Sequence, residues 1–362
     1  MKIAFMNSIP SPVWRGGEKW MVTAAAGLHD RGHSVICIGK PDAVWLRKAR
    51  DRGVDTREYP VRMDFDPVMI FRLWRFFRKN KRDILCCNFE KDVRIGGVAA
   101  KLAGVQKIFV RKGLALLYDK ATYRWAYRWV VDDIITPALS IKKSFKQFEW
   151  INQERIHVVP NGVEIPDTAG WSRKYLCNEL GVSGECPLVL GAGRLFEQKG
   201  FEYFLEAVAK IKNGGKQIAC AIAGGGDTAP YEKIARNLKI ETDVFFLGER
   251  NDLRRLMYGP DIFVLSSIDE GLPNVVLEAM SVGTPVVATR AGDADVIIDD
   301  MVNGILAPVK DAGCLAEKIR WLLDNKDMRM RFSEQGLSTV KQRYSIPAMV
   351  GSIEKLFAIK TG

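Results

Sequence analysis

Residues 2–39 read KIAFMNSIPSPVWRGGEKWMVTAAAGLHDRGHSVICIG, and residues 187–226 read PLVLGAGRLFEQKGFEYFLEAVAKIKNGGKQIACAIAGGG. Each stretch has a short apolar run, a loop that contains glycine, apolar residues at helical spacing, and a second apolar run. Strands that alternate with helices in this way predict βαβ units and a parallel sheet. Further runs typical of buried strands lie at 244–247, 261–266, 284–289 and 304–308. The sequence therefore predicts two doubly wound α/β domains.

A linker between the halves is predicted at residues 158–166, VVPNGVEIP, where two prolines flank an Asn-Gly turn. We expect one domain over 1–165 and a second over 166–344. Helical patterns follow at 327–344 and 346–359, and the last helix, in the segment 345–362, is expected to cross back to the first domain. Because ligands of parallel sheets bind outside the carboxyl ends of the strands, both domains are expected to offer loops to one cleft.

The composition is that of an ordinary globular protein. Of the 362 residues, 47% are apolar and 27% are charged, which excludes disorder and low complexity and provides material for two cores. No apolar run approaches the ~20 residues that a membrane-spanning helix needs. Asn7 interrupts the opening run KIAFMN, which predicts a strand rather than a signal peptide.

The cysteines and histidines point to neither disulfides nor a metal centre. The seven cysteines are odd in number and form no Cys-x-x-Cys, which favours a reduced, cytoplasmic compartment. The three histidines, His29, His33 and His157, are too few and too scattered for a histidine metal site.

The positive charge is concentrated in the first half. Residues 1–165 hold 30 Lys and Arg against 17 Asp and Glu, a net charge of +13, whereas residues 166–362 have a net charge of −2. Such asymmetry indicates an anionic partner for the first half: nucleic acid, a membrane surface or an acidic substrate. The alternative is a solvated basic face without a partner.

The most informative stretch is residues 267–280, SIDEGLPNVVLEAM. A buried strand ends before it, and an apolar helix is predicted to begin near Asn274. Backbone N–H groups at such a helix N-terminus favour anions and ligand hydroxyls. Glu270 on the loop and Glu278 about a turn into the helix could both face one ligand; the alternative is a helix cap and a solvated glutamate.

A second loop, residues 191–200, reads GAGRLFEQKG and follows a predicted strand. Arg194 and Lys199 on it could clamp a diphosphate, although two cations on a loop are often only solvated. No Gly-x-x-x-x-Gly-Lys-Ser/Thr occurs, which excludes a P-loop. Gly-x-Gly-x-x-Gly is absent between Asn7 and Glu18, which weighs against a dinucleotide oxidoreductase.

These loops belong to an ordered series of motifs. The others are VPNGV at 159–163, AGGG at 223–226, FLGER at 246–250, GTPVVAT at 283–289, Gly292 and Asn303-Gly304. The series resembles glycosyltransferase family 4, closely over about residues 156–310, and Gly16-Gly17-Glu18 extends it toward the N-terminus. The resemblance implies a GT-B fold, with two Rossmann-like domains facing a cleft: an acceptor-side domain over 1–165 and a donor-binding domain over 166–344.

The resemblance also implies a retaining transferase that uses a nucleotide-diphosphate sugar. At the matching positions, Arg194 and Lys199 would stabilise charge on the leaving diphosphate, an electrostatic role. Glu278 would bind the donor ribose, and Arg250 lies where the family places the nucleotide base. Glu270 and the backbone N–H groups of residues 271–275 would hold the transferred sugar and the distal phosphate; these residues are Gly271, Leu272, Pro273, Asn274 and Val275, and of them only Pro273 lacks an N–H.

In the first domain, Gly16 and Gly17 would let their loop approach the donor phosphates, because Gly17 has no Cβ. Many relatives also place a histidine after a mid-domain strand to contact the donor sugar. The corresponding run, IFVRKG at 108–113, has none. Either Arg111 or Lys112 substitutes as a cationic contact, or the sugar contact comes from elsewhere.

No metal or other cofactor is expected. Asp293-Ala294-Asp295 has the spacing of a manganese-binding Asp-x-Asp, but its place after Gly292 and before an apolar run favours helix N-capping. Arg194 and Lys199 are available to neutralise a diphosphate. The resemblance implies that Glu270, Arg194 and Lys199 carry catalysis and that the leaving phosphate oxygen accepts the acceptor's proton.

The acceptor side is expected to meet a membrane. Residues 68–82 form a basic amphipathic pattern in which Ile70, Leu73, Trp74 and Phe77 share one face, and residues 123–129, YRWAYRW, add a second basic aromatic patch. The pattern fits either a membrane-surface helix or a helix that packs its apolar stripe on the sheet. No nucleic-acid motif is present, and nucleic acid is set aside as a partner.

We therefore expect transfer of a sugar from a nucleotide-diphosphate sugar to a glycan or lipid-linked acceptor, of the lipopolysaccharide or cell-surface polysaccharide type. The expected location is cytoplasmic, peripheral on the inner face of the cell membrane. Two alternatives are a sugar-nucleotide epimerase of the same fold and a non-catalytic sugar-nucleotide or membrane-binding module.

Overall fold

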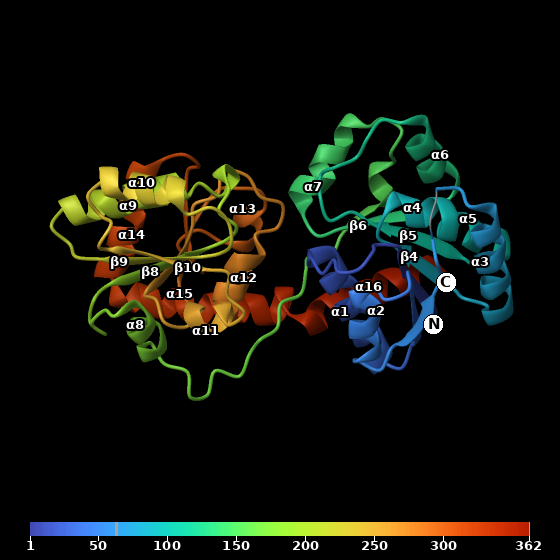
Figure 1. Cartoon of the computed structure of the whole chain (residues 1–362), viewed down its shortest axis with the longest axis horizontal. Helices are drawn as coiled ribbons and strands as arrows, with labels where there is room; N and C mark the ends of the chain where they lie inside the picture. The colour runs from blue at the N-terminus through green and yellow to red at the C-terminus, as the bar shows by residue number, and fades with distance from the viewer. Residues whose placement is uncertain (62–63, 362) are drawn as a thin grey trace. The chain divides into compact units, whose positions relative to one another are not determined.

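The chain folds into two compact units, each with its own parallel sheet. The computed structural model describes residues 1–61 and 64–361. Unit 1 comprises Met1–Gly162 and Ile346–Gly362, and unit 2 comprises Val163–Ser345. Figure 1 follows the chain through both units.

Unit 1 contains a seven-stranded sheet in the order β3-β2-β1-β4-β5-β6-β7, and every neighbouring pair is parallel. Its strands are β1 (Lys2–Asn7), β2 (Ser34–Gly39), β3 (Asp55–Glu58), β4 (Ile84–Cys87), β5 (Lys107–Arg111), β6 (Asp133–Thr136) and β7 (Ile156–Val158). Its main helices are α1 (Gly16–Asp30), α2 (Val44–Arg50), α3 (Pro67–Asn80), α5 (Val98–Ala103), α6 (Ala121–Trp129), α7 (Leu139–Ser144) and α16 (Ile346–Thr361).

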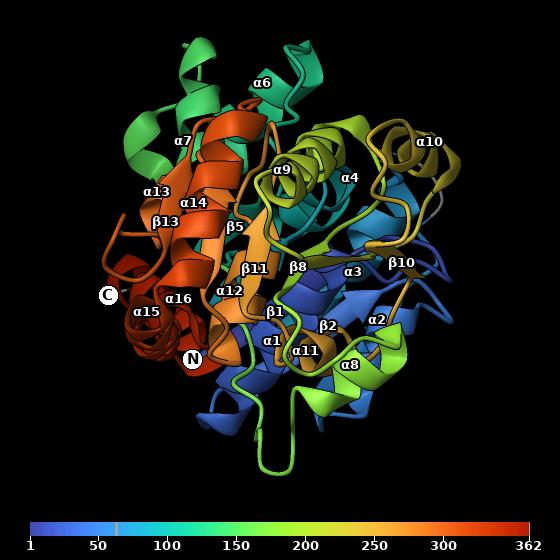
Figure 2. The same cartoon turned by 90° about the vertical axis from the view of Figure 1, so that its left-hand side faces the viewer.

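Unit 2 contains a six-stranded sheet in the order β10-β9-β8-β11-β12-β13, again parallel throughout. Its strands are β8 (Leu188–Ala192), β9 (Ala219–Ala223), β10 (Val244–Gly248), β11 (Ile262–Leu265), β12 (Val286–Thr289) and β13 (Ile305–Ala307). Its main helices are α8 (Lys174–Leu180), α9 (Phe201–Asn213), α10 (Ala229–Asn237), α11 (Leu253–Met257), α12 (Asn274–Ser281), α13 (Ala294–Ile297), α14 (Ala312–Asp324) and α15 (Lys326–Thr339). Figure 2 shows β8 and β11 side by side. The prediction of two doubly wound α/β domains is confirmed.

Alternating β-strand side chains build the core of each unit. Ile3 and Phe5 on β1 are fully buried among residues of α1, α2 and α16. Val189 on β8 is buried among residues of α9, α10 and α14. Helices cover both faces of each sheet, as is usual for parallel sheets. This explains why the strand sequences are continuous apolar runs rather than alternating apolar and polar residues.

The last helix, α16, belongs to unit 1. It packs on α1, where a Cβ on Gly27 would lie 2.4 Å from Cγ2 of Val350. The rings of Phe357 and Phe109 are 4.7 Å apart between centroids. Residue 362, at the end of the segment predicted to cross back, lies outside the described residues.

Two segments differ in detail from the prediction. The beginning of the predicted linker, at Val158, closes β7, the edge strand of the first sheet. The helix predicted over 327–344 is α15 only as far as Thr339, and Val340–Tyr344 continues as a π-helical turn. Both differences arise where the chain passes from one unit to the other.

The basic helix at 68–82 is α3, and its predicted apolar face is only partly right. Leu73 and Phe77 are buried as expected, but Ile70 and Trp74 are half-buried. Met69 and Phe76 complete the buried stripe instead. The helix thus packs on the unit and also leaves apolar side chains exposed.

Candidate active site

The loops after β8 and β11 meet at a change of direction in the second sheet. The chain runs from β8 to β9 on one side and later places β11 on the other side of β8. Such a switch point opens a crevice at the carboxyl ends of the strands, where ligands of open α/β sheets bind.

Lys199 and Glu270 join these two loops. Lys199 Nζ lies 2.5 Å from Glu270 Oε1, which also accepts a hydrogen bond of 2.8 Å from Ser267 Oγ. Ser266 Oγ in turn donates to the carbonyl oxygen of Lys199 at 2.9 Å. The two charged side chains are mostly buried, with 22% and 12% of their surface exposed. The pair is therefore held in place before any ligand arrives.

Because Gly292 has no side chain, the backbone of the Glu270 loop can pass very close to the Gly292 backbone. A Cβ at this position would lie 2.0 Å from the carbonyl oxygen of Glu270, and the φ angle is +57°. The adjacent Asp293 donates its backbone N–H to the carbonyl oxygen of Gly271 at 2.9 Å. Any side chain at Gly292 would displace Glu270.

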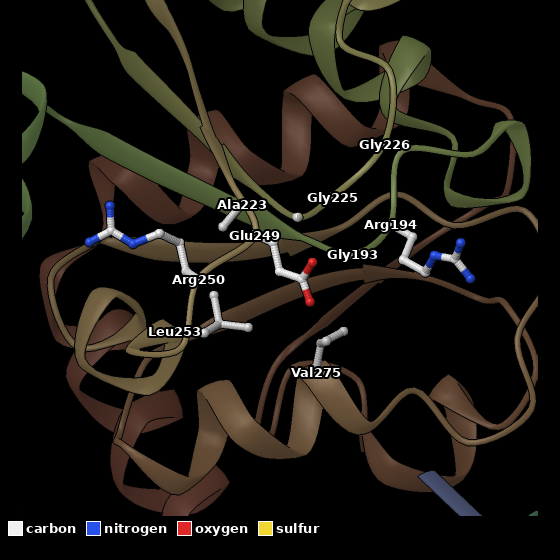
Figure 3. A pocket seen from close by; sticks show the side chains of 10 residues that line it. Gly193, Arg194, Ala223, Gly225, Gly226, Glu249, Arg250, Leu253 and Val275 are labelled. Carbon is white, nitrogen blue, oxygen red and sulfur yellow. The ribbon is translucent and has the colours of Figure 1, made fainter. Parts of the chain in front are cut away.

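A pocket of about 370 Å³ opens beside the switch point. Its floor is made by the ends of β8 and β9, which approach so closely that a Cβ on Gly224 would lie 1.8 Å from the carbonyl oxygen of Gly193. Its walls come from the loop after β10 and the start of α12 (Figure 3). The lining residues are Gly193, Arg194, Ala223, Gly224, Gly225, Gly226, Glu249, Arg250, Leu253 and Val275.

The two arginines of this pocket have different surroundings. Arg194 is exposed and stacks on Phe196, 4.5 Å from the ring centroid, and pairs with no carboxylate of the described residues. Arg250 donates to Asp252 at 2.8 and 2.9 Å and to Glu179 at 2.6 Å. These carboxylates raise the pKa of Arg250, and the Arg250 guanidinium holds the pKa of Asp252 below its usual range. Arg194 is thus the cation available to an anion, while Arg250 is already neutralised.

The start of α12 faces the pocket through Val275. Pro273 occupies the N-cap position without a capping hydrogen bond from its side chain, and Asn274 begins the helix. Glu278 lies three residues after Val275, on the same helical face, and is half-buried. Leu272 and Gly271 precede the helix on the Glu270 loop.

Gly16 and Gly17 lie in unit 1, at the first turn of α1. A Cβ on Gly17 would lie 3.2 Å from Asn88 Nδ2 and 3.7 Å from Arg111 Nη1, whereas one on Gly16 would meet open space. Arg111 is 6% exposed and lies 4.9 Å from the Trp20 ring centroid. Burial lowers the pKa of Arg111 to about 10.

Arg111 and Lys112 are not equivalent. Lys112 is paired with the carboxylate of Glu90, and both side chains are largely buried. Arg111 makes no ion pair with any of the described residues. Of the two cations that could substitute for a histidine, only Arg111 is therefore available.

Sequence reasoning missed the contribution of Glu249. Its carboxylate points into the pocket between Gly193 and Val275, while the guanidinium groups of Arg194 and Arg250 point to opposite sides (Figure 3). Its position directly after β10 was the available signal, since loops at the carboxyl ends of strands build such sites. The Glu179–Arg250 pair could not be foreseen, because 71 residues separate its partners.

Asp293 occupies the N-cap position of α13, as predicted, but makes no capping hydrogen bond through its side chain. Among residues 1–61 and 64–361, no group of three or more His, Cys, Asp or Glu side chains is arranged to hold a metal ion.

Two family models match the chain, one in each half. The model "Glycosyltransferase Family 4" matches residues 14–165, and the model "Glycosyl transferases group 1" matches residues 176–339. The lipopolysaccharide core biosynthesis glycosyltransferase LpsE of Rhizobium meliloti is 26% identical over 347 residues, which are 95% of this chain and 96% of LpsE. The UDP-Gal:alpha-D-GlcNAc-diphosphoundecaprenol alpha-1,3-galactosyltransferase of Escherichia coli is 25% identical over 81% of this chain and 79% of its own.

Solved structures show the same fold. HepE of Anabaena in complex with UDP superposes with a TM-score of 0.83 at 20% identity and covers 99% of this chain and 100% of its own. A glycosyltransferase from Rickettsia africae superposes with a TM-score of 0.85, also at 20% identity, over 99% and 98% of the two chains. The chain has the GT-B fold and belongs to glycosyltransferase family 4.

Proposed function

We propose that this glycosyltransferase transfers a sugar, with retention of anomeric configuration, from a nucleotide-diphosphate sugar to a glycan or lipid-linked acceptor of the lipopolysaccharide or cell-surface polysaccharide type. The observation that carries the proposal is the mostly buried Lys199–Glu270 pair. It lies beside the pocket whose floor is made of glycines and whose Arg194 forms no ion pair with the described residues. The printed names of LpsE and of the E. coli galactosyltransferase support the acceptor class. The complexes of HepE with UDP and with UDP-glucose support a nucleotide-sugar donor.

In this proposal the donor diphosphate lies between Arg194 and Lys199. Both cations stabilise the charge that grows on the leaving phosphate as the bond between the sugar C1 and the phosphate oxygen breaks. The acceptor hydroxyl attacks C1 from the same face, and its proton passes to the leaving phosphate oxygen. Neither a protein nucleophile nor a metal ion takes part in this scheme.

The other proposed contacts with the donor are assigned from where their residues lie in the fold. The backbone amides of Gly271 and Leu272 before α12, and of Asn274 and Val275 at its start, hold the distal phosphate and the transferred sugar with Glu270. Glu278, on the Val275 face of α12, accepts hydrogen bonds from the ribose hydroxyls. Arg250 borders the base-binding part of the pocket as a rigid, neutralised group. Within unit 1 itself, Arg111 beside the turn that contains Gly16 and Gly17 is proposed as an anion contact.

We also propose that unit 1 works on the cytoplasmic face of a membrane. Exposed apolar side chains gather at the start of α3 and on α6: Phe65, Val68, Phe71, Trp125 and Trp129. The Phe65 and Trp125 rings are 5.9 Å apart, so the two segments form one surface, here called the aromatic surface. Exposed Arg72 and Arg75 flank it on α3. Among the described residues, none of the helices combines the length and the apolar character needed to cross a bilayer.

A ligand screen tests the donor site. The melting temperature of the purified protein is measured with UDP, GDP, ADP or CMP, each with and without magnesium. We expect one nucleoside diphosphate to raise it without magnesium, by the linkage between binding and stability. No shift with any nucleotide, or a shift that requires magnesium, would contradict the proposed donor site.

Variants then test the chemistry. Lys199→Ala and Glu270→Ala should each lower turnover with the identified donor by roughly 100-fold or more, because each removes an electrostatic contact of the transition state. Glu197→Ala is the matched control, since Glu197 is an exposed residue of the same loop. If both variants keep full activity, the site assignment is wrong. Release of an epimerised sugar without any acceptor would favour an epimerase instead.

A further inference from the structure

Unit 1 has a second pocket, at the opposite end of β5 from Arg111. Its volume is about 340 Å³, and its lining includes Lys101, Lys107, Arg128, Trp129, Asp132 and Arg155. Lys107 is the first residue of β5, and Arg155 directly precedes β7. The pocket therefore opens at the amino ends of the strands, whereas Arg111 lies at the carboxyl end of β5, about 13 Å away at ~3.3 Å per strand residue.

The pocket holds more positive than negative charge. Lys101 Nζ is paired with Asp132 at 2.9 Å, and the remaining aspartate of the lining, Asp133, lies 2.7 Å from His157 Nε2. Arg155 is occupied by backbone carbonyls, donating to the oxygen of Asp132 at 2.5 Å and to that of Tyr127 at 3.3 Å.

Lys107 and Arg128 are left without a counterion. Neither side chain forms an ion pair with any of the described residues, and Arg128 lies over the Trp129 ring at 5.5 Å. A guanidinium and an ammonium at one small cavity bind a phosphate group well, the first with two parallel N–H donors and the second as a point charge.

The rim of the pocket continues into the aromatic surface. Trp129, which lines the pocket, is 62% exposed, and Trp125, one helical turn earlier on α6, is 40% exposed. Indole rings on a surface that also carries arginines favour the level of the lipid headgroups. A ligand that brings a phosphate to the pocket and acyl chains to the tryptophans would satisfy both features.

We propose that the pocket formed by Lys107, Arg128 and Trp129 binds the phosphate of an anionic phospholipid headgroup. The inference rests on the proposed membrane association of unit 1, which it makes specific. None of its lining residues is among those assigned to the donor site, so its role in this proposal is to hold the enzyme on the membrane rather than to take part in sugar transfer.

Vesicle flotation of the full chain tests this proposal. The vesicles contain phosphatidylcholine alone or with phosphatidylglycerol. The variant is Lys107→Gln/Arg128→Gln, and the control is Arg47→Gln/Lys48→Gln, which removes two exposed cations of α2 and the same net charge. We expect the pocket variant to bind phosphatidylglycerol vesicles roughly tenfold more weakly than the control variant. Turnover on a soluble acceptor should be unchanged in both.

The outcomes separate this proposal from membrane association in general. Equal binding of the two variants to phosphatidylglycerol vesicles would overturn the headgroup site while leaving membrane association intact. Absence of wild-type binding to any vesicle would overturn both.

A phosphate source other than lipid is tested with inorganic phosphate. If phosphate raises the melting temperature of the wild type but not of the pocket variant, and vesicles do not bind, the ligand is a soluble phosphate and the lipid assignment is wrong.

Discussion

A buried guanidinium without a salt bridge lowers stability, and Arg111 is such a group among the described residues, since Glu18 acts on it electrostatically but forms no ion pair with it. It is held by a cation–π contact with Trp20 and by the close approach of Gly17 and Gly113, not by an ion pair with any described residue. The unfavourable desolvation is consistent with its lowered pKa. Strongly perturbed pKa values cluster at functional sites, which makes Arg111 a candidate functional residue.

Arg111→Gln should therefore separate activity from stability. We expect kcat/KM for the donor to fall roughly 10- to 100-fold, the effect of losing a charge-assisted hydrogen bond of about 1.5–3 kcal/mol. The free energy of unfolding should change by less than about 1 kcal/mol, because the lost cation–π contact is offset by the removal of a buried charge.

Lys112→Gln provides the comparison for Arg111→Gln. It removes the cation beside the buried Glu90, which keeps the hydrogen bond from the Tyr127 hydroxyl, and should mainly lower the free energy of unfolding. Steady-state kinetics and urea unfolding of both variants check the prediction. A loss of stability without loss of activity in Arg111→Gln would assign Arg111 a structural role.

Asp92 gives a pH-dependent prediction. Its fully buried carboxylate accepts backbone hydrogen bonds from Ser8 at 2.8 Å and Phe89 at 3.0 Å, and burial raises its pKa to about 7 from an ordinary 3.8. Because the folded-state pKa is raised, the folded protein binds the extra proton. The stability that Asp92 contributes is then present below pH 3.8 and is lost as the pH rises through 7.

In Asp92→Asn this titration is absent, so the pH dependence should differ from that of the wild type. The unfolding free energy of the wild type minus that of the variant should be constant below about pH 4, fall as the pH rises from about 4 to about 7, and level off above that. Urea unfolding across that range measures it, and all other groups cancel in the difference. A constant difference would show that Asp92 stays ionised throughout.

At the scale of helices and strands, the sequence predicted the existence of elements well and their contacts poorly. Apolar runs placed β11 and β12 within two residues of their observed bounds because buried parallel strands are apolar on both faces. The predicted face of α3 combined the buried Leu73 and Phe77 with the half-buried Ile70 and Trp74, because helical spacing shows which residues share a face, not how far that face is covered. The pairing of Arg250 with Glu179 depends on tertiary structure alone.

The contact between α1 and α16 is set by Gly27. A Cβ there would lie 2.4 Å from Val350 Cγ2, so Gly27→Ala should lower the free energy of unfolding of unit 1 by about 1–3 kcal/mol through overpacking. Gly351→Ala is the control on α16, because its Cβ would meet only the flexible end of Arg31 at 3.4 Å. Helix propensity favours alanine there by about 0.5–1 kcal/mol. Equal unfolding curves for the two variants would contradict this packing.

At the scale of the whole molecule, the division of charge follows the division of the fold. The net charge of +13 lies in residues 1–165, nearly all in unit 1, and the aromatic surface and the second pocket lie there too. Unit 2 carries the glycine-floored pocket and the Lys199–Glu270 pair. Composition predicts an anionic partner for the first half, and the structure adds that Lys107 and Arg128 form no ion pair with the described residues.

Because each unit has its own core, a substitution that destabilises one unit is expected to leave the other unit folded. Phe357 is fully buried in unit 1 beside Phe109, although it lies near the end of the chain, and Phe332 is fully buried in unit 2. Phe357→Ala should destabilise unit 1 by about 3–5 kcal/mol, and Phe332→Ala should do the same to unit 2. Hydrogen exchange, read peptide by peptide, should lose protection in β1–β6 for the first variant and in β8–β13 for the second. The nucleotide-induced rise in melting temperature should survive only in Phe357→Ala. Loss of protection across both sheets in either variant would mean that the chain unfolds as one unit.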